Sequence, residues 1–268
     1  MSSLKEQKQF TDLVKSKFNS KELDWILAKT AIVSNIETSK KFNMLFSLTS
    51  RFVSNEIIAW SPEEIKSLDT IYPGFGTTQW NKQDLTRILL MLALPPSINK
   101  AIIESFFEIA EMKEQVVLYK GLYLLENASE FSNQVAEGIR TNMANVFDAI
   151  ASGNPFAQKY LDEEAWNQLI LKSFFMDRPL YTIQNIDQGK NENLANMLQD
   201  YVKERWAAGR QVSLEIWRMI TGYLRDDIKQ LISERNFKDL EKEVIDTISQ
   251  QNNPDLNSEY WDAIGKTK

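Results

Sequence analysis

Glycine and proline are scarce in this chain, and this scarcity limits the folds that it can adopt. The 268 residues include only 9 Gly and 7 Pro, about half of the ~12% that these residues contribute to average proteins. A β-rich protein of this length needs many tight turns, which use Gly, Pro and Asn-Gly pairs. The composition therefore favours helices joined by short connectors. A hydrophobic content of 43% is enough to fill a sizeable core.

Apolar residues recur at helical spacing along most of the chain, for example between Phe42 and Phe52. Ser61-Pro62-Glu63-Glu64 has the pattern of a capping box, with Pro in the first helical turn. Asn81 marks another helix start, and that helix runs to Leu94. Further helices are predicted at 98–110, 113–126, 131–139, 142–152, 162–175, 191–208 and 213–223, with two or three more between 224 and 264.

Many short helices with short connectors predict an all-α fold built of stacked antiparallel helical pairs. No repeat signature of ~34 to ~45 residues is present. Diverged repeats keep only their apolar spacing, so we expect an irregular α-solenoid of HEAT or armadillo type. A compact orthogonal helical bundle is the alternative. Residues 1–268 are expected to form a single all-α domain.

The stretch Ile71–Trp80 is the longest irregular one. Its Gly74 and Gly76 follow no predicted strand and precede no Gly-Lys-Ser/Thr, so a phosphate-binding loop is not favoured. We expect a packed connector that is held by Tyr72, Phe75 and Trp80.

The chain contains no Cys and no His. It therefore forms no disulfide and carries no thiolate nucleophile, and Ser-His-Asp and Cys-His catalysis are excluded. The usual ligands of zinc, haem and non-haem iron are missing as well, and no EF-hand loop is present. We expect no cofactor and no metal. Any catalysis must use carboxylate, Lys, Arg, Tyr or hydroxyl groups.

The net charge of -6 disfavours nucleic acid as a partner. The longest apolar run, Ile88–Leu94, has only 7 residues, far short of the ~18 that a membrane-spanning helix needs. The first residues lack the apolar core of a signal peptide. These features predict a cytoplasmic protein without a transmembrane segment.

Polar residues on predicted core faces mark candidate sites. Asn167 falls inside the apolar arc of helix 162–175, and a buried amide needs partners. It either satisfies a neighbouring helix end or contacts a ligand. Arg205 projects onto the middle of the core face of helix 191–208. It is a buried ion-pair partner, an exposed group at a helix end, or a ligand-binding Arg.

The predicted helix 142–152 carries Asn142, Asn145, Asp148 and Ser152 on one side. Asn is a poor helix former, so this row suits a lined groove or an interhelical polar network. A plain exposed face is the alternative. Seven of the nine Arg residues follow residue 139, and Arg binds carboxylates and phosphates with two hydrogen bonds. The C-terminal half is therefore the expected location of a site.

Two motifs stand out in the second half of the chain: Ala165-Trp-Asn-Gln168 and Glu204-Arg-Trp-Ala-Ala-Gly-Arg210. Together they resemble the EboA family, and the resemblance covers about residues 72–220. It leaves the flanking helices of 1–71 and 221–268 outside. Further similar positions are Trp80, Asp84, Arg87, Leu89–Pro95, Arg140–Met143, Val146-Phe147, Asn154-Pro155, Leu171-Lys172, Arg178–Leu180, Leu194-Ala195, Met197, Tyr201 and Trp217-Arg218.

The chain departs from the family pattern at two places. Members tend to carry Gly-Leu-Asp-x-Arg-Ala-Asn where this chain has Asn-Ile-Asp-Gln-Gly-Lys-Asn at 185–191. They also tend to have a His where this chain has Lys203. If that His were catalytic in relatives, this protein could not share the reaction.

The resemblance implies a component of the ebo gene cluster, which occurs in diverse bacteria and some algal plastids. The cluster is associated with making or exporting a secondary metabolite, in cyanobacteria a precursor of the sunscreen scytonemin. The resemblance assigns no reaction to the EboA component. The implied partners are other proteins of the cluster or a small-molecule intermediate.

We therefore expect a non-catalytic helical binding or scaffold protein that holds a partner protein or an anionic or polar intermediate. A polar groove is predicted between helices 142–152, 162–175 and 191–208. Its candidate residues are Arg140, Asn142, Asn145, Asp148, Asn167, Lys172, Arg205 and Arg210. Arg would hold an anion, and the amides would fix its orientation. The alternatives are a carboxylate acid/base enzyme acting on a prenylated or sugar-like precursor, and residues that only lock the core.

Overall fold

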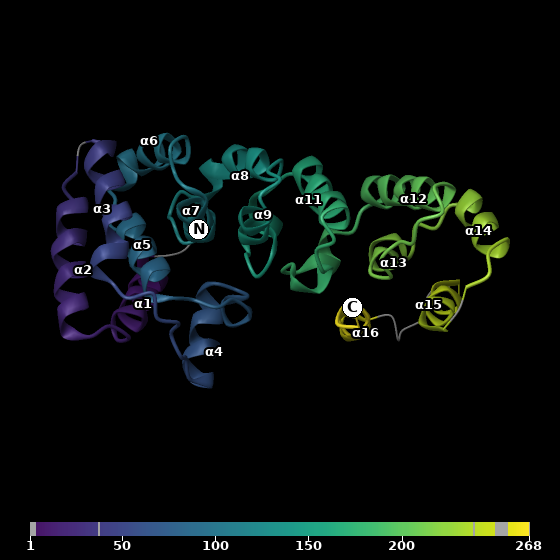
Figure 1. Ribbon diagram of the computed structural model, residues 1–268, viewed down its shortest axis with the longest axis horizontal. Coiled ribbons are helices and arrows are strands. Elements are labelled where there is room, and N and C mark those ends of the chain that lie inside the picture. The colour runs from purple at the N-terminus through teal and green to yellow at the C-terminus, as the bar shows by residue number, and fades with distance from the viewer. Residues whose placement is uncertain (1–3, 37, 238, 250–256, 268) are drawn as a thin grey trace. The chain divides into compact units, whose positions relative to one another are not determined.

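The computed structural model describes residues 4–36, 38–237, 239–249 and 257–267. Every named element in these residues is a helix, and strand-like pairing is confined to isolated bridge residues, among them the antiparallel bridge between Ile57 and Asn81 (Figure 1). The all-α prediction is confirmed. The choice between an α-solenoid and a compact bundle stays a prediction. In the described residues no helix is long and apolar enough to cross a membrane.

The chain divides into two compact units, Met1–Leu161 and Asp162–Lys268, and each is described by itself. The single domain stays a prediction. Unit 1 contains α1 (Leu4–Lys15), α2 (Ser20–Val33), α3 (Ser39–Phe52), α4 (Pro62–Ile71), η1 (Phe75–Thr77), α5 (Lys82–Leu92), α6 (Pro96–Phe107), α7 (Met112–Leu122), η2 (Ala128–Phe131), α8 (Ser132–Gly138), α9 (Ala144–Ala151) and α10 (Phe156–Tyr160).

Unit 2 has six α-helices and two short 3₁₀ turns among its described residues. They are α11 (Glu163–Phe175), η3 (Leu180–Thr182), η4 (Ile186–Gly189), α12 (Glu192–Ala207), α13 (Ile216–Ile220), α14 (Asp226–Ser233), α15 (Asp239–Ser249) and α16 (Ser258–Gly265). Helix α12 packs against both α11 and α13.

The helix starts predicted from capping residues are confirmed. Ser61 and Glu64 form a complete capping box at α4. The side chain of Asn81 accepts a hydrogen bond from the backbone N–H of Asp84 at 2.8 Å and so caps α5. Several predicted boundaries were wrong by two to four residues. For example, α9 begins at Ala144 and not at residue 142, and α13 covers Ile216–Ile220 and not 213–223.

Three helices of unit 1 meet closely. Helix α7 packs against α5 and α9, and Gly121 makes the approach to α5 possible. A Cβ atom at Gly121 would lie 2.7 Å from the sulfur of Met91, which is closer than real Cβ contacts allow. The backbone of α7 therefore runs directly against α5, and polar residues of α5, α7 and α9 come within one region.

The connector Ile71–Trp80 is packed as predicted. The ring of Trp80 stacks on that of Phe75 with 4.8 Å between centroids, and its indole N–H donates to the Phe75 carbonyl at 3.0 Å. Tyr72 meets Trp80 edge-on. All three rings are buried, so Trp80 is a rigid support directly before α5.

Candidate binding site

A cavity of about 520 Å³ in unit 1 is lined by the segment before α5 and by α5, α7 and α9. This volume suits a small molecule. The lining is polar for an interior surface. Its charged and hydrogen-bonding side chains include those of Asp84, Arg87, Lys113, Lys120, Asn145, Asp148 and Ser152.

Asp84 and Arg87 lie one helical turn apart on α5 and reach the cavity from the same face. The Nε of Arg87 donates to the Phe46 carbonyl at 3.2 Å, and its guanidinium lies over the Phe46 ring at 5.6 Å. Only 7% of Arg87 is exposed. These contacts fix one side of the guanidinium and leave the group at the cavity wall.

Lys120 enters the cavity from α7. Its Nζ lies 5.0 Å from the centroid of the Trp80 ring, a cation–π contact. Among the residues that the structure describes, no carboxylate lies within ion-pairing distance of Lys120, and no hydrogen bond is made by its ammonium group. A desolvated ammonium without a paired anion is costly, so Lys120 is the most unusual group in the cavity.

Burial disfavours the charged forms of Asp84, Arg87 and Lys120 and shifts the pKa of each group accordingly. It raises the pKa of the Asp84 carboxyl, and the charges of Lys120 and Arg87 offset part of that rise. Burial lowers the pKa of Lys120, an effect that Asp84 opposes. Burial also lowers the pKa of Arg87, against the charges of Asp84 and Glu114. Burial and the charges of the neighbouring groups thus act in opposite directions on all three pKa values.

Helix α9 brings two of the predicted site residues to this cavity. Asn145 and Asp148 line it, together with Ser152 just after the helix. This placement fits the lined-groove interpretation of the polar row. Asn142 is exposed, lies ahead of the helix and is outside the lining. Arg140 is also outside it and pairs with Glu137 at 3.3 Å on the surface.

A second cavity, of about 640 Å³, adjoins the first in unit 1. Gln83, Arg87 and Lys113 line both. In this second cavity, Glu114 accepts a hydrogen bond from the Ser47 hydroxyl at 2.6 Å. Arg87 therefore stands at the wall between the two cavities.

In unit 2, Asn167 is buried as predicted, with 4% of its surface exposed. Its amide pairs with that of Asn191, the N-cap of α12. Asn167 therefore satisfies a neighbouring helix end. Of the two interpretations of this residue, the structural role is the one observed, and not contact with a ligand.

Arg205 does not lie in the middle of the core face of α12, and that prediction was wrong. The buried residues of this helix are Leu194, Ala195, Leu198, Gln199, Val202 and Trp206. Arg205 is half-buried and donates to the Gln211 carbonyl from Nε at 3.1 Å and from a terminal nitrogen at 2.8 Å. With Arg210 and the aromatic Phe175 and Tyr201, it lines a cavity of about 480 Å³.

Lys172 is half-buried, and burial lowers its pKa. It lines neither the cavity beside Arg205 nor any other cavity described above. The eight predicted site residues thus fall four in each unit, and the groove across helices 142–152, 162–175 and 191–208 stays a prediction.

Lys120 was not predicted as a site residue, and Asp84 and Arg87 were noted only among the positions that resemble the EboA family. A usable signal was present, because Lys120 is the one charged residue in the otherwise apolar run 116–125. A lone charge within such a run must be buried or face a cavity.

A buried ion network in unit 2 was missed as well. Arg218 is only 2% exposed, and two of its nitrogens donate to the carboxylate of Asp187 at 2.8 and 2.6 Å. A third donates to Asp262 at 2.7 Å. The network joins η4, α13 and α16, so its role is to hold these elements together.

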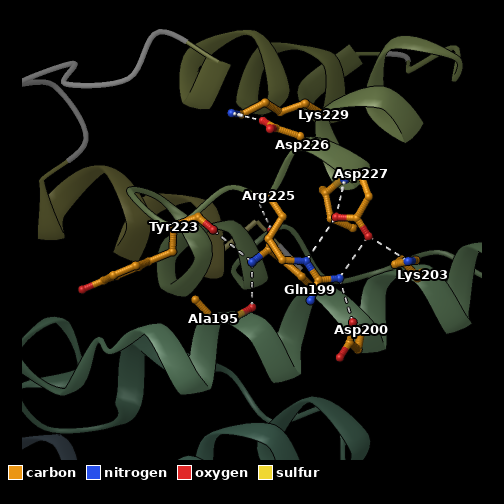
Figure 2. Close-up of polar contacts among 10 residues, drawn as sticks. Ala195, Gln199, Asp200, Lys203, Tyr223, Arg225, Asp226, Asp227 and Lys229 are labelled. Atoms are coloured by element: carbon orange, nitrogen blue, oxygen red, sulfur yellow. Dashed lines mark hydrogen bonds and ion pairs between the residues drawn. The ribbon is translucent and has the colours of Figure 1, made fainter.

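A second polar cluster joins α12 to the start of α14 (Figure 2). The buried amide of Gln199 donates to the carbonyls of Ala195 and Tyr223, both at 3.1 Å, and accepts from the backbone N–H of Arg225 at 2.8 Å. At its surface edge Lys203 pairs with Asp227 at 2.8 Å. The residue at the family's His position is thus a partly exposed ion-pair partner here.

The fold and the cavity together define a helical protein with a polar pocket of small-molecule size. A model of the family described as "Metabolite traffic protein EboA" matches residues 6–221. The chain therefore belongs to the EboA family, and the resemblance noted in its motifs is confirmed. The match also takes in residues 6–71, which the motifs had left outside. The match includes every residue that lines the unit 1 cavity. Neither curated proteins nor solved structures gave a match. Among the described residues, no group of three or more carboxylates is placed to hold a metal ion.

Proposed function

We propose that this protein binds a small anionic metabolite in the cavity of unit 1 and holds it without converting it. The observation that carries this proposal is the Lys120 ammonium, which faces the cavity without an ion pair to any residue that the structure describes. An anionic group of a ligand would supply the partner that the protein does not provide.

The remaining lining supports the same chemistry. The terminal nitrogens of Arg87 can join Lys120 in holding a carboxylate or phosphate, because only its Nε is occupied by the Phe46 carbonyl. Asn145 and Ser152 offer hydrogen bonds that would fix the orientation of the bound molecule. Such binding agrees with the metabolite traffic that describes the family.

The proposal also covers the pathway, the partner protein and the location in the cell. The metabolite would be an intermediate of the pathway that the ebo gene cluster encodes, and another protein of that cluster would deliver or receive it. We place this activity in the cytoplasm. Arg140, Asn142, Lys172, Arg205 and Arg210 remain proposed contacts for such a partner and lie outside the unit 1 cavity.

One observation favours a second function, that of a carboxylate acid/base enzyme. Burial raises the pKa of Asp84 at the cavity wall, and perturbed carboxylates are typical of active sites. The two functions differ in what happens to the bound compound, which is released unchanged by a carrier and converted by an enzyme.

The test is to purify the tagged protein from its own host, denature it, and identify released small molecules by mass spectrometry. Three variants accompany the wild type: Lys120→Gln, Arg87→Gln and Lys100→Gln. The last makes the same charge change on α6, where Lys100 lies 4.0 Å from Glu104 and outside the cavity lining. We expect one anionic compound with the wild type and with Lys100→Gln, and its loss with the other two. An empty wild type, or equal retention by Lys120→Gln, would overturn the proposal.

A further inference from the structure

Lys120 shares its cavity with the cations Arg87 and Lys113 and with the carboxylates Asp84 and Asp148. Arg87 and Asp84 stand on α5 across from α7. A lysine that is desolvated, or placed next to another cation, has a larger share of neutral amine and becomes a nucleophile toward carbonyl carbon. Lys120 meets the first condition, since its side chain faces the cavity from α7 and burial lowers its pKa.

We infer that Lys120 forms a reversible imine with an aldehyde or ketone group of the bound metabolite. This inference rests on the proposed function, because the same cavity holds the ligand. It narrows the ligand to an anion that also carries a carbonyl group.

The step balances without an oxidant or reductant. The neutral amine nitrogen of Lys120 bonds to the carbonyl carbon, the C=O π bond breaks, and the oxygen takes a proton to give a carbinolamine. The C–O bond then breaks, and the oxygen leaves with both nitrogen protons as one water molecule. We assign the passing of these protons to Asp84, because its carboxyl lines the same cavity as Lys120 and burial raises its pKa.

The surroundings of Lys120 select it over surface lysines. The Nζ of Lys120 lies over the Trp80 ring. Trp80 is itself fixed by stacking on Phe75 and by the hydrogen bond from its indole N–H to the Phe75 carbonyl. Lys113 lines the same cavity but is exposed. It therefore provides an internal comparison within each sample.

The probe is glyoxylate, which is a small anion with an aldehyde group. The full-length protein is incubated with glyoxylate and cyanoborohydride at pH 7, which converts an imine to a stable carboxymethyl-lysine, and the modified peptides are quantified. We expect Lys120 to be modified about tenfold more than Lys113 in the folded protein and equally in denaturant. Asp84→Asn should slow the modification of Lys120 and leave that of Lys113 unchanged.

A second experiment distinguishes anion binding in the cavity from imine formation at Lys120. Malonate, an anion without an aldehyde, is titrated into the wild type and into Lys120→Arg by calorimetry, and thermal unfolding shows whether each variant is folded. Malonate binding without preferred labelling of Lys120 would overturn the imine and leave the anion site. Absence of both malonate binding and labelling would overturn both. Labelling that Asp84→Asn does not slow would remove Asp84 from the step.

Discussion

Asn167 and Asn191 bind each other through both of their side-chain amides. Asn191 donates to the oxygen of Asn167 at 2.8 Å, and Asn167 donates back at 3.3 Å. The same Asn191 oxygen accepts the backbone N–H of Leu194 at 2.8 Å and caps α12. A buried amide on α11 thus orients the residue that starts α12. Part of the Ala-Trp-Asn-Gln motif therefore serves to join two helices.

Replacing Asn167 with Ala should lower the free energy of unfolding by about 1–3 kcal/mol, because the Asn191 amide loses a buried partner. The measurement is urea unfolding followed by circular dichroism. Gln168→Ala is the matched control, since Gln168 bonds only to Glu164 at the helix surface, and it should change stability by less than about 0.5 kcal/mol. Equal effects of the two variants would contradict a capping role for Asn167.

Asp187 should stabilise the protein in a pH-dependent manner. Burial alone would raise its pKa, but hydrogen bonds from Arg218 and Ser258 and the Arg218 charge hold it well below the ordinary value. A lowered pKa gives stability that is present above the ordinary pKa of about 4 and is lost as pH falls below it. Asp187→Asn should therefore cost about 3 kcal/mol at pH 7, and its difference from the wild type should shrink between pH 5 and pH 2.

Unfolding curves collected across this pH range test the prediction. Asp226→Asn is the control, because Asp226 pairs with Lys229 at a surface position where its side chain is 96% exposed. It should change stability at pH 7 by less than about 1 kcal/mol. If the stability difference between Asp187→Asn and the wild type stayed constant from pH 7 to pH 2, the charge of Asp187 would not be what holds Arg218.

Lys120 should lower the stability of the folded protein, although it provides the anion binding. Burial lowers its pKa, which means that folding disfavours its charged form, so the wild type should gain stability as pH rises toward the ordinary lysine pKa. Lys120→Met removes the charge and keeps most of the volume. We expect it to stabilise the protein by about 0.5–2 kcal/mol and to abolish anion binding. Lys100→Met should do neither, and a lower unfolding temperature for Lys120→Met would mark Lys120 as a structural residue.

Local patterns in the sequence predicted the fold class well, because helix starts depend on neighbouring residues. Ser61 and Asn81 cap the helices that their spacing indicated. Arg205 was misplaced because apolar spacing alone did not locate the buried face of α12. Gln199 is fully buried, and with Ala195 and Trp206 it turns the core face away from Arg205. A polar side chain whose partners lie on another segment cannot be assigned to the core from the helix alone.

The cavity could be predicted only in part for the same reason. The polar row Asn145, Asp148 and Ser152 was visible as an unusual face of α9. Its counterparts Asp84 and Lys120 lie on α5 and α7, and their meeting depends on packing such as the approach of Gly121 to Met91. Contacts of this kind join residues far apart in the chain, and no spacing rule encodes them.

Gln199 provides the last prediction, because its amide is the buried centre of the cluster between α12 and α14 (Figure 2). Gln199→Leu would leave the Tyr223 carbonyl and the Arg225 N–H without that partner, so unfolding should be easier by about 1–3 kcal/mol. Amide hydrogen exchange in α14 should also become faster. Lys203→Gln removes only the partly exposed pair with Asp227 and should cost less than about 1 kcal/mol. If exchange in α14 were faster in Lys203→Gln than in Gln199→Leu, the surface ion pairs and not the buried amide would hold α14.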